Sequence, residues 1–288
     1  MRFGDPTHVL TLERFRLLRD MINRRFGIYF SDDNMFLVES RLSDRIERLG
    51  LGSFDEYYHL LKYYAEADEE MDRVIDILTT NETYFFREEY QLRAFLNDIL
   101  PEIRERHERR RRLSIWSAGC SSGEEVYTIA MLLLESGMFK GWDLRVFGND
   151  ISEAVIQKAR GGVYSPNSFR TTRPETVRRF FTDTADGMRI NDEVRSVCHF
   201  AKANLLDTEQ FYFVGQADVI FCRNVLIYFD KKSKMEAISV FYDRLRPGGY
   251  LLLGHTESLI NLSTAFELAH LSEDLVYRKP EVLHARRR

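Results

Sequence analysis

The clearest pattern of apolar and polar positions in the chain lies between residues 113 and 134. It begins as a short apolar strand, passes through a turn of small residues from Ser117 to Gly123, and continues from Glu124 with apolar side chains at helical spacing. In an open α/β sheet such a turn lies at the carboxyl end of its strand, where ligands bind. Gly119 has no side chain, so a ligand can approach the backbone closely there. The pattern therefore predicts a small-molecule site at this turn.

Two carboxylates, Glu124 and Glu125, follow the turn directly. The turn has neither the G-x-x-x-x-G-K-[ST] motif of a nucleotide triphosphate site nor the G-x-G-x-x-G motif of a dinucleotide site. Negative charge at a helix N-terminus stabilises the helix but repels an anionic ligand. We therefore expect a cationic ligand such as S-adenosylmethionine. The alternative is that the two glutamates only stabilise the first helical turn.

The pattern changes in character along the chain. Residues 1–80 show helical spacing throughout, and alternating strands and helices follow. We expect a helical N-terminal domain over 1–80, a linker with a helix over 81–112, and an α/β domain over 113–288 with a doubly wound, mostly parallel sheet. Glycines and prolines between residues 161 and 195 predict a small inserted antiparallel subdomain.

A second apolar strand, Leu144–Phe147, is followed by Gly148, Asn149 and Asp150. In dinucleotide-type folds an acidic residue at the tip of the second strand binds the ribose hydroxyls. Asp150 suits that role, although it lies about 30 residues after Gly119 where the fingerprint expects about 20. The longer intervening helix accounts for the difference. The alternative is that Asp150 is an ordinary turn residue.

Composition and charge exclude several classes of protein. Apolar residues make up 44% of the 288 residues and charged residues 30%, as in ordinary globular proteins. No apolar run approaches the roughly 18 residues of a membrane helix, and residues 1–8 lack the apolar segment of a signal peptide, so we expect a cytoplasmic protein without membrane insertion. Cys120, Cys198 and Cys222 are scattered, which predicts reduced thiols and no metal site. The arginine-rich run 104–112 lacks interleaved aromatic residues, so nucleic acid is not an expected partner.

Three arginines in the helical domain, Arg41, Arg45 and Arg48, follow each other at spacings of four and three. This spacing places them on one face of a helix. The face could bind an acidic partner helix. Acidic residues lie nearby in the sequence, so an ordinary salt-bridged surface is the alternative.

Four motifs follow one another along the chain: NETYFFR at 81–87, WSAGCSSGEEVY at 116–127, FCRNVLIYFD at 221–230 and GGYLLLGHTE at 248–257. Each motif alone would be weak evidence, but together and in this order they resemble the chemotaxis receptor methyltransferases of the CheR family. The resemblance implies a class I methyltransferase-like fold. It also implies a bacterial, cytoplasmic enzyme that transfers a methyl group from S-adenosylmethionine to receptor glutamates and leaves S-adenosylhomocysteine.

The resemblance also implies roles for individual residues. The positions that would line the cofactor are Asn81, Thr83, Arg87, Glu125, Asp150, Asn204, Leu205, Arg223 and Asn224. Arg87 and Tyr228 would lie closest to the reacting groups. A glutamate has an unperturbed pKa of about 4.3, so it is already ionised at neutral pH and forming its ester needs no general base. Arg87 and Tyr228 would instead orient the carboxylate through the guanidinium and the phenol hydroxyl.

The implied partners are the acidic cytoplasmic helices of chemoreceptors, which favours the docking hypothesis for Arg41, Arg45 and Arg48. We predict that Arg45→Glu lowers receptor methylation and leaves cofactor affinity unchanged.

Family members that tether to a receptor's C-terminal pentapeptide carry a longer, glycine-rich loop in the inserted subdomain, whereas residues 182–187 contain a single glycine. We therefore expect a protein that does not use the tether. Separately, we expect a monomer.

Two other functions remain open at this point. One is a regulatory module that binds the cofactor without transferring the methyl group. The other is a methyltransferase that acts on a different acceptor, such as a small acid or a protein other than a receptor. Mild alkali distinguishes the acceptors, because a glutamyl methyl ester releases methanol under conditions that leave other methyl groups in place.

Overall fold

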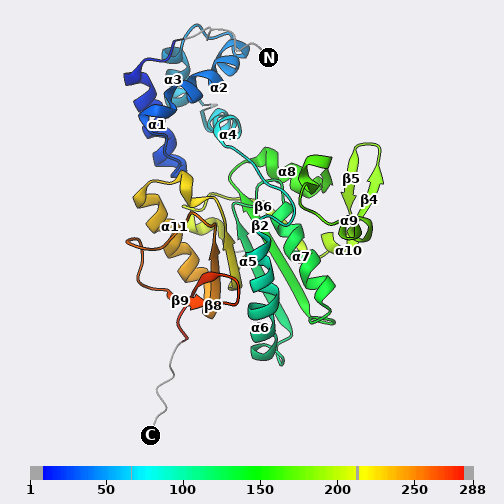
Figure 1. Cartoon of the computed structure of the whole chain (residues 1–288). Helices are drawn as coiled ribbons and strands as arrows, with labels where there is room; N and C mark the ends of the chain where they lie inside the picture. Colours follow the sequence, from blue (N-terminus) through cyan, green and yellow to red (C-terminus); the bar gives the residue numbers. More distant parts are fainter. Residues whose placement is uncertain (1–8, 66, 212–213, 282–288) are drawn as a thin grey trace. The chain divides into compact units, whose positions relative to one another are not determined.

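Figure 1 shows the computed structural model of the chain, which describes residues 9–65, 67–211 and 214–281. The chain divides into two compact units. The first contains residues up to Thr80 together with Tyr228–Lys234. The second contains Asn81–Ile227 and the residues from Met235 onward. Residues 228–234 thus belong with the N-terminal helices, although they follow a strand of the second unit in sequence.

Amphipathic helices build the first unit. They are α1 (Leu12–Phe26), α2 (Met35–Arg48), α3 (Phe54–Tyr63) and α4 (Ala67–Leu78), with a 3-10 turn at Asp32–Asn34. Apolar residues at helical spacing, such as Phe15, Leu42 and Val74, are almost fully buried and form the core. The segment 228–234 joins this unit through its backbone. Phe229 forms an isolated bridge with Ile28, and the N–H of Tyr29 donates to the carbonyl of Tyr228 at 2.8 Å.

A seven-stranded sheet forms the centre of the second unit. Its strands are β1 (Arg112–Ala118), β2 (Asp143–Asp150), β6 (Cys198–Lys202), β7 (Ala217–Cys222), β8 (Leu245–Leu253), β9 (Glu267–His270) and β10 (Leu275–Arg278). The order across the sheet is β6-β2-β1-β7-β8-β10-β9. The first five strands in this order are parallel, and the last two are antiparallel. The mostly parallel sheet predicted from the sequence is therefore confirmed.

Helices cover both faces of this sheet. They are α5 (Glu89–Ala94), α6 (Leu100–Arg106), α7 (Glu124–Ser136), α8 (Glu153–Gly161) and α11 (Lys231–Arg244), with a π-helical turn at Phe95–Ile99 and 3-10 turns at Thr208–Phe211 and Leu226–Tyr228. Successive residues of β1 point to opposite faces. Ile115 packs in the core that contains Ile129 of α7, whereas Trp116 contacts Phe241 of α11. No helix among the described residues is long and apolar enough to cross a membrane.

A second, three-stranded sheet lies between β2 and β6 in the sequence. It consists of β3 (Val163–Tyr164), β4 (Phe181–Thr184) and β5 (Gly187–Ile190), and its neighbours are a 3-10 turn at Pro166–Phe169, α9 (Pro174–Phe180) and α10 (Asp192–Arg195). The strand order is β3-β5-β4 and all pairs are antiparallel. Figure 1 shows β4 and β5 as a short hairpin beside α9 and α10. The predicted inserted antiparallel subdomain is confirmed.

A buried carboxylate, Asp218, joins the first residues of β7 to β1. Its side chain is 2% exposed and accepts a hydrogen bond from the N–H of Ser114 at 2.9 Å. Arg246 lies 3.1 Å from this carboxylate, and Arg110 and His107 lie 3.6 Å from it. Burial lowers the pKa of His107 below its usual value of 6.5 and outweighs Asp218, which raises it.

His107 should make the unfolding free energy pH-dependent. Since its pKa is lower in the folded chain, the unfolded chain takes up the proton first as the pH falls. The stabilisation by neutral His107 is complete above about pH 6.5 and is lost as the pH falls through the folded-state pKa. When the pH falls from about 7.5 to about 5.5, the unfolding free energy of the wild type should decrease more than that of His107→Gln. Urea titration at each pH measures the two decreases. Equal losses in both proteins would contradict this.

Candidate functional site

The turn after β1 is packed tightly between two other segments. The N–H groups of Gly119 and Cys120 both donate to the carbonyl of Asn149, at 2.9 and 2.8 Å. Gly119 has a φ of +77°, and a Cβ at this position would lie 2.5 Å from the side chain of Val225. The turn is therefore held on one side by the end of β2 and on the other by the loop that follows β7. Only glycine suits this conformation and this spacing.

Gly119→Ala should weaken the binding of the predicted ligand about tenfold or more. The left-handed conformation costs an alanine roughly 1–2 kcal/mol, and the added methyl group would displace Val225 and its loop. Calorimetric titration with S-adenosylhomocysteine measures the change. The double variant Gly119→Ala, Val225→Ala should recover part of the affinity, because the shorter side chain removes the collision. Wild-type affinity in the single variant would contradict the tight packing.

Asp150 and Asn149 lie at the end of β2, beside the turn. The carboxylate of Asp150 is buried and accepts hydrogen bonds from the N–H groups of Ser121 at 2.9 Å and Ser152 at 3.1 Å. Asn149 accepts a hydrogen bond from the indole N–H of Trp116 at 2.7 Å and donates to the carbonyl of Ala203 at 3.0 Å. Asn149 thus ties together the ends of β1, β2 and β6. Sequence reasoning missed this role, although an amide after an apolar strand was a usable signal.

The two glutamates after the turn face different surroundings. Glu124 is 1% exposed and accepts hydrogen bonds from the hydroxyls of Ser122 at 2.8 Å and Ser168 at 3.0 Å. Glu125 instead accepts from the hydroxyl of Ser117 at 2.7 Å and from Nε of Arg223 at 2.6 Å. Glu125 therefore joins the turn to Arg223, whereas Glu124 is bound by serine hydroxyls. The negative charge of Glu125 is balanced by Arg223, so the turn carries less net negative charge than the sequence alone indicated.

The motif at residues 81–87 is anchored by Phe85. Its ring is fully buried among Tyr164, Phe169 and Phe181, all from the inserted subdomain. Its N–H donates to the carbonyl of Ser168 at 2.9 Å. These contacts fix the segment that carries the candidate residues Asn81, Thr83 and Arg87.

Arg223 connects this segment to the turn. Its side chain is 3% exposed, and its guanidinium donates to Glu125 at 2.6 Å and to the carbonyl of Arg87 at 2.9 Å. The guanidinium of Arg87 itself donates to the carbonyl of Glu82 at 2.9 Å. The structure thus brings together Arg87, Glu125 and Arg223, which are far apart in sequence. Asn204 and Leu205 lie near Asp150, since they directly follow Ala203, whose N–H donates to the carbonyl of Asp150 at 2.9 Å.

Backbone strain and unpaired polar atoms coincide at this site. Phe86, Glu88, Ser121 and Asn224 have φ values of 59°, 56°, 50° and 60°, which non-glycine residues rarely adopt. The hydroxyl oxygen of Ser121 and the side-chain carbonyl of Asn224 are buried and have no hydrogen-bond partner among the described residues. Strained backbone clusters at functional sites, and a buried polar group without a partner calls for one. Together with the acidic Asp150, they suit a ligand that carries ribose hydroxyls and an ammonium group.

The remaining candidates lie in the first unit. Tyr228 is 39% exposed and its backbone carbonyl pairs with Tyr29. Arg41 donates to the carbonyl of Leu78 at 2.7 Å. Arg45 forms a bidentate ion pair with Glu70: its Nε donates to one carboxylate oxygen at 2.8 Å and its Nη2 to the other at 2.5 Å.

Glu70 is buried and also accepts a hydrogen bond from the hydroxyl of Tyr57 at 2.7 Å. Arg45 therefore has a structural partner inside the helical unit. Arg48 is exposed and forms no ion pair within the described parts of the chain.

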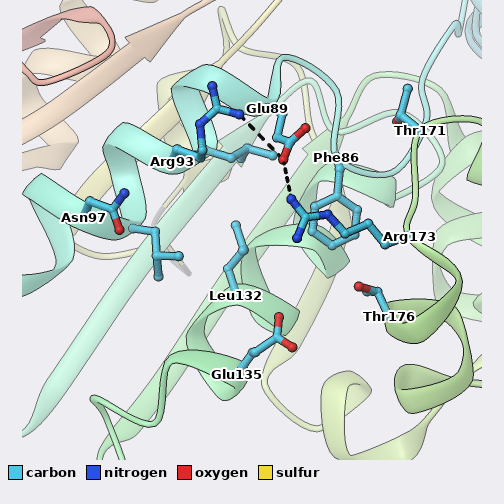
Figure 2. A pocket seen from close by; sticks show the side chains of 11 residues that line it. Phe86, Glu89, Arg93, Asn97, Leu132, Glu135, Thr171, Arg173 and Thr176 are labelled. Carbon is cyan, nitrogen blue, oxygen red and sulfur yellow. Dashed lines mark hydrogen bonds and ion pairs between the residues drawn. The ribbon is translucent and has the colours of Figure 1, made fainter.

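A separate hollow of about 290 Å³ lies between α5, α7 and the segment before α9. Figure 2 shows Arg93 and Arg173 directed at Glu89, and the ion-pair distances are 3.6 and 3.2 Å. Leu132 of α7 and Phe86 contribute apolar surface. None of the candidate cofactor residues lines this hollow. Glu135, which also lines the hollow, pairs with Arg179 outside it, so each charged group here already has a partner.

Two known protein families match successive parts of the chain. The family described as CheR methyltransferase, all-alpha domain, matches residues 13–79, and the family described as CheR methyltransferase, SAM binding domain, matches residues 81–274. The turn after β1, Asp150 and the loop that contains Arg223 all lie within the second matched range.

Full-length relatives agree with this assignment. Chemotaxis protein methyltransferase 2 of Vibrio cholerae is 38% identical over 274 residues, which cover 94% of this chain and 94% of the relative. The chemotaxis protein methyltransferase of Salmonella typhimurium is 38% identical over 88% of this chain and 86% of its own length.

Among solved structures, the chain is similar to magnesium protoporphyrin IX methyltransferase of Synechocystis with bound S-adenosylmethionine. The identity is 16% and the TM-score 0.36, over 77% of this chain and 93% of that one. The identity to the full-length relatives and the two family matches decide the assignment. The chain belongs to the CheR family of S-adenosylmethionine-dependent chemotaxis protein methyltransferases.

Proposed function

We propose that this methyltransferase esterifies glutamate side chains on the cytoplasmic helices of chemoreceptors. The observation that carries the proposal is the position of Arg223, whose guanidinium binds both Glu125 and the carbonyl of Arg87. This contact holds the backbone of Arg87 beside the turn that carries the proposed cofactor residues. The planar guanidinium of Arg87 suits a carboxylate acceptor, because it can bind both carboxylate oxygens at once.

The residues of the site account for the chemistry without a general base. S-adenosylmethionine, when bound, supplies a methyl group that is open to attack by a nucleophile. A glutamate carboxylate is ionised at neutral pH and is itself the nucleophile. Asp150 would bind the ribose hydroxyls, and Asn204, Leu205 and Asn224 would complete the cofactor site. Arg87 would hold the incoming carboxylate, so that positioning supplies most of the rate gain.

Methyl transfer to purified receptor cytoplasmic fragments tests this proposal. The protein is incubated with S-adenosylmethionine labelled in the methyl group, and the labelled fragments are then treated with mild alkali. We expect label on the fragments and its release as volatile methanol. Fragments with glutamine in place of the labelled glutamates serve as the control and should take up no label. Alkali-stable label would indicate another acceptor, and absence of transfer despite cofactor binding would indicate a regulatory module.

A docking role for the arginine face is best tested at Arg48. Arg45→Glu would place a second carboxylate against buried Glu70, so it would destabilise the helical unit and would not isolate docking. Arg48→Glu changes only an exposed charge.

We expect Arg48→Glu to raise the KM for receptor fragments about fivefold or more, through lost attraction to acidic helices. The affinity for S-adenosylhomocysteine should not change. Arg24→Glu, an exposed charge reversal on α1, is the matched control and should have a smaller effect. Equal effects of the two variants would argue for general attraction and against a docking face.

A further inference from the structure

The loop after β7 carries two of the proposed cofactor contacts, Arg223 and Asn224. Its backbone does not belong to a helix or strand until the 3-10 turn at Leu226, and Asn224 has a φ of 60°. A loop in this conformation needs partners for its N–H groups. Three of these groups, at Asn224, Val225 and Ile227, donate to the carboxylate of Glu257.

Glu257 lies in the segment after β8, 30 to 33 residues after these three donors in sequence. One carboxylate oxygen accepts from the N–H groups of Asn224 and Gly254, both at 2.8 Å. The other oxygen accepts from Val225 at 3.0 Å and Ile227 at 3.2 Å. Burial raises the pKa of Glu257, and the four N–H groups oppose that shift by stabilising the charged form. Both oxygens of the carboxylate are therefore fully used by backbone.

The two segments are also in direct contact. A Cβ at Gly254 would lie 2.8 Å from the backbone nitrogen of Asn224 and 2.8 Å from the carboxylate of Glu257. The absence of a side chain at Gly254 thus permits the loop to approach Glu257. On its other side, the loop contacts Gly119 through Val225. The loop is consequently held between Glu257 and the turn after β1.

We propose that Glu257 is a positioning residue for cofactor binding. Its carboxylate sets the backbone of residues 224–227 and so directs Arg223 toward Glu125 and the unpaired side-chain carbonyl of Asn224 toward the cofactor. Glu257 does not touch the cofactor itself. The proposal rests on the placement of the cofactor beside this loop and is independent of the methyl acceptor, so it can be tested with the cofactor product alone.

A glutamine cannot replace Glu257 in this role. Its amide oxygen could accept the two N–H groups of one oxygen, but its NH₂ group would face the two N–H groups of the other. Glu257→Gln therefore loses two hydrogen bonds and sets donors against donors while it keeps the size of the side chain. Glu257→Asp keeps both oxygens but draws them back by one methylene.

The test is calorimetric titration of the full chain with S-adenosylhomocysteine. We expect Glu257→Gln to bind about tenfold or more weakly than the wild type, and Glu257→Asp to lie between the two. In turnover assays the KM for S-adenosylmethionine should rise similarly, while kcat at saturating cofactor should stay within about threefold. Glu267→Gln removes an exposed carboxylate from β9 and is the matched control with unchanged affinity.

Hydrogen exchange separates positioning from simple stability. In Glu257→Gln the amides of Asn224, Val225 and Ile227 should exchange faster, while those of β1 and β2 keep their protection. A lower melting temperature with unchanged affinity of the folded protein would overturn the proposal. If Glu257→Gln does not fold, Glu257→Asp decides the question, and wild-type affinity in that variant with faster exchange at the loop would overturn it. Failure of receptor esterification would leave these binding results unaffected, so the two proposals fail separately.

Discussion

Asp150→Asn should weaken the binding of S-adenosylhomocysteine by about 100-fold or more. The substitution keeps the size of the side chain but removes the charge that we assign to the ribose hydroxyls. Hydrogen bonds to a charged group are each worth about 1.5–3 kcal/mol, and two of them correspond to roughly 100-fold or more in affinity. The amide can also accept from only one of Ser121 and Ser152, so the turn would loosen as well.

Calorimetric titration measures this loss directly. Asp183→Asn is the matched control, because Asp183 is an exposed carboxylate in the inserted subdomain of the same unit. Its affinity should equal that of the wild type. An Asp150→Asn protein that is folded by circular dichroism and binds within about threefold of the wild type would rule out the ribose role.

Arg87→Lys should lower kcat for methyl transfer by about 100-fold or more, with a much smaller effect on cofactor affinity. Lysine keeps the positive charge but lacks the planar fork that binds both oxygens of a carboxylate. A displacement of about 1 Å in the reacting carboxylate can cost about 100-fold in rate. The backbone of Arg87 remains held by Arg223, so the variant should fold normally.

Steady-state kinetics with receptor fragments tests this expectation. Arg93→Lys is the control, since Arg93 lies in the next helix and pairs with Glu89 and Glu273 on the surface. It should leave kcat unchanged. A kcat for Arg87→Lys within about threefold of the wild type would show that Arg87 does not orient the acceptor.

Local patterns predicted the fold and the positions of the turn at Gly119 and of Asp150. The strand, turn and helix between residues 113 and 134 are determined by residues close to one another in sequence. The spacing of apolar residues and the position of Gly119 are therefore enough to predict β1, the turn and α7. Asp150 was predictable for a similar reason, because the tip of a second parallel strand lies beside the tip of the first.

Features that depend on distant residues were not predictable. Glu124 and Glu125 are adjacent, and only the fold places Ser168 beside one and Arg223 beside the other. Glu257 belongs to a recognisable motif, but nothing near it in sequence indicates that its carboxylate binds the backbone of residues 224–227.

The arginine face illustrates the same limit. The spacing of Arg41, Arg45 and Arg48 predicts a shared side of a helix, but it does not identify what each arginine meets. Glu70, which pairs with Arg45, comes from α4 and is 25 residues away. Charge spacing alone therefore cannot separate a docking residue from one that stabilises the unit.

The crystal structure of the complex with S-adenosylhomocysteine tests the central claim most directly. We predict that the ribose hydroxyls lie within hydrogen-bonding distance of the carboxylate of Asp150, and that the side-chain carbonyl of Asn224 gains the partner it lacks. Placement of the ligand away from the turn at Gly119, or in the hollow between α5 and α7, would contradict the account.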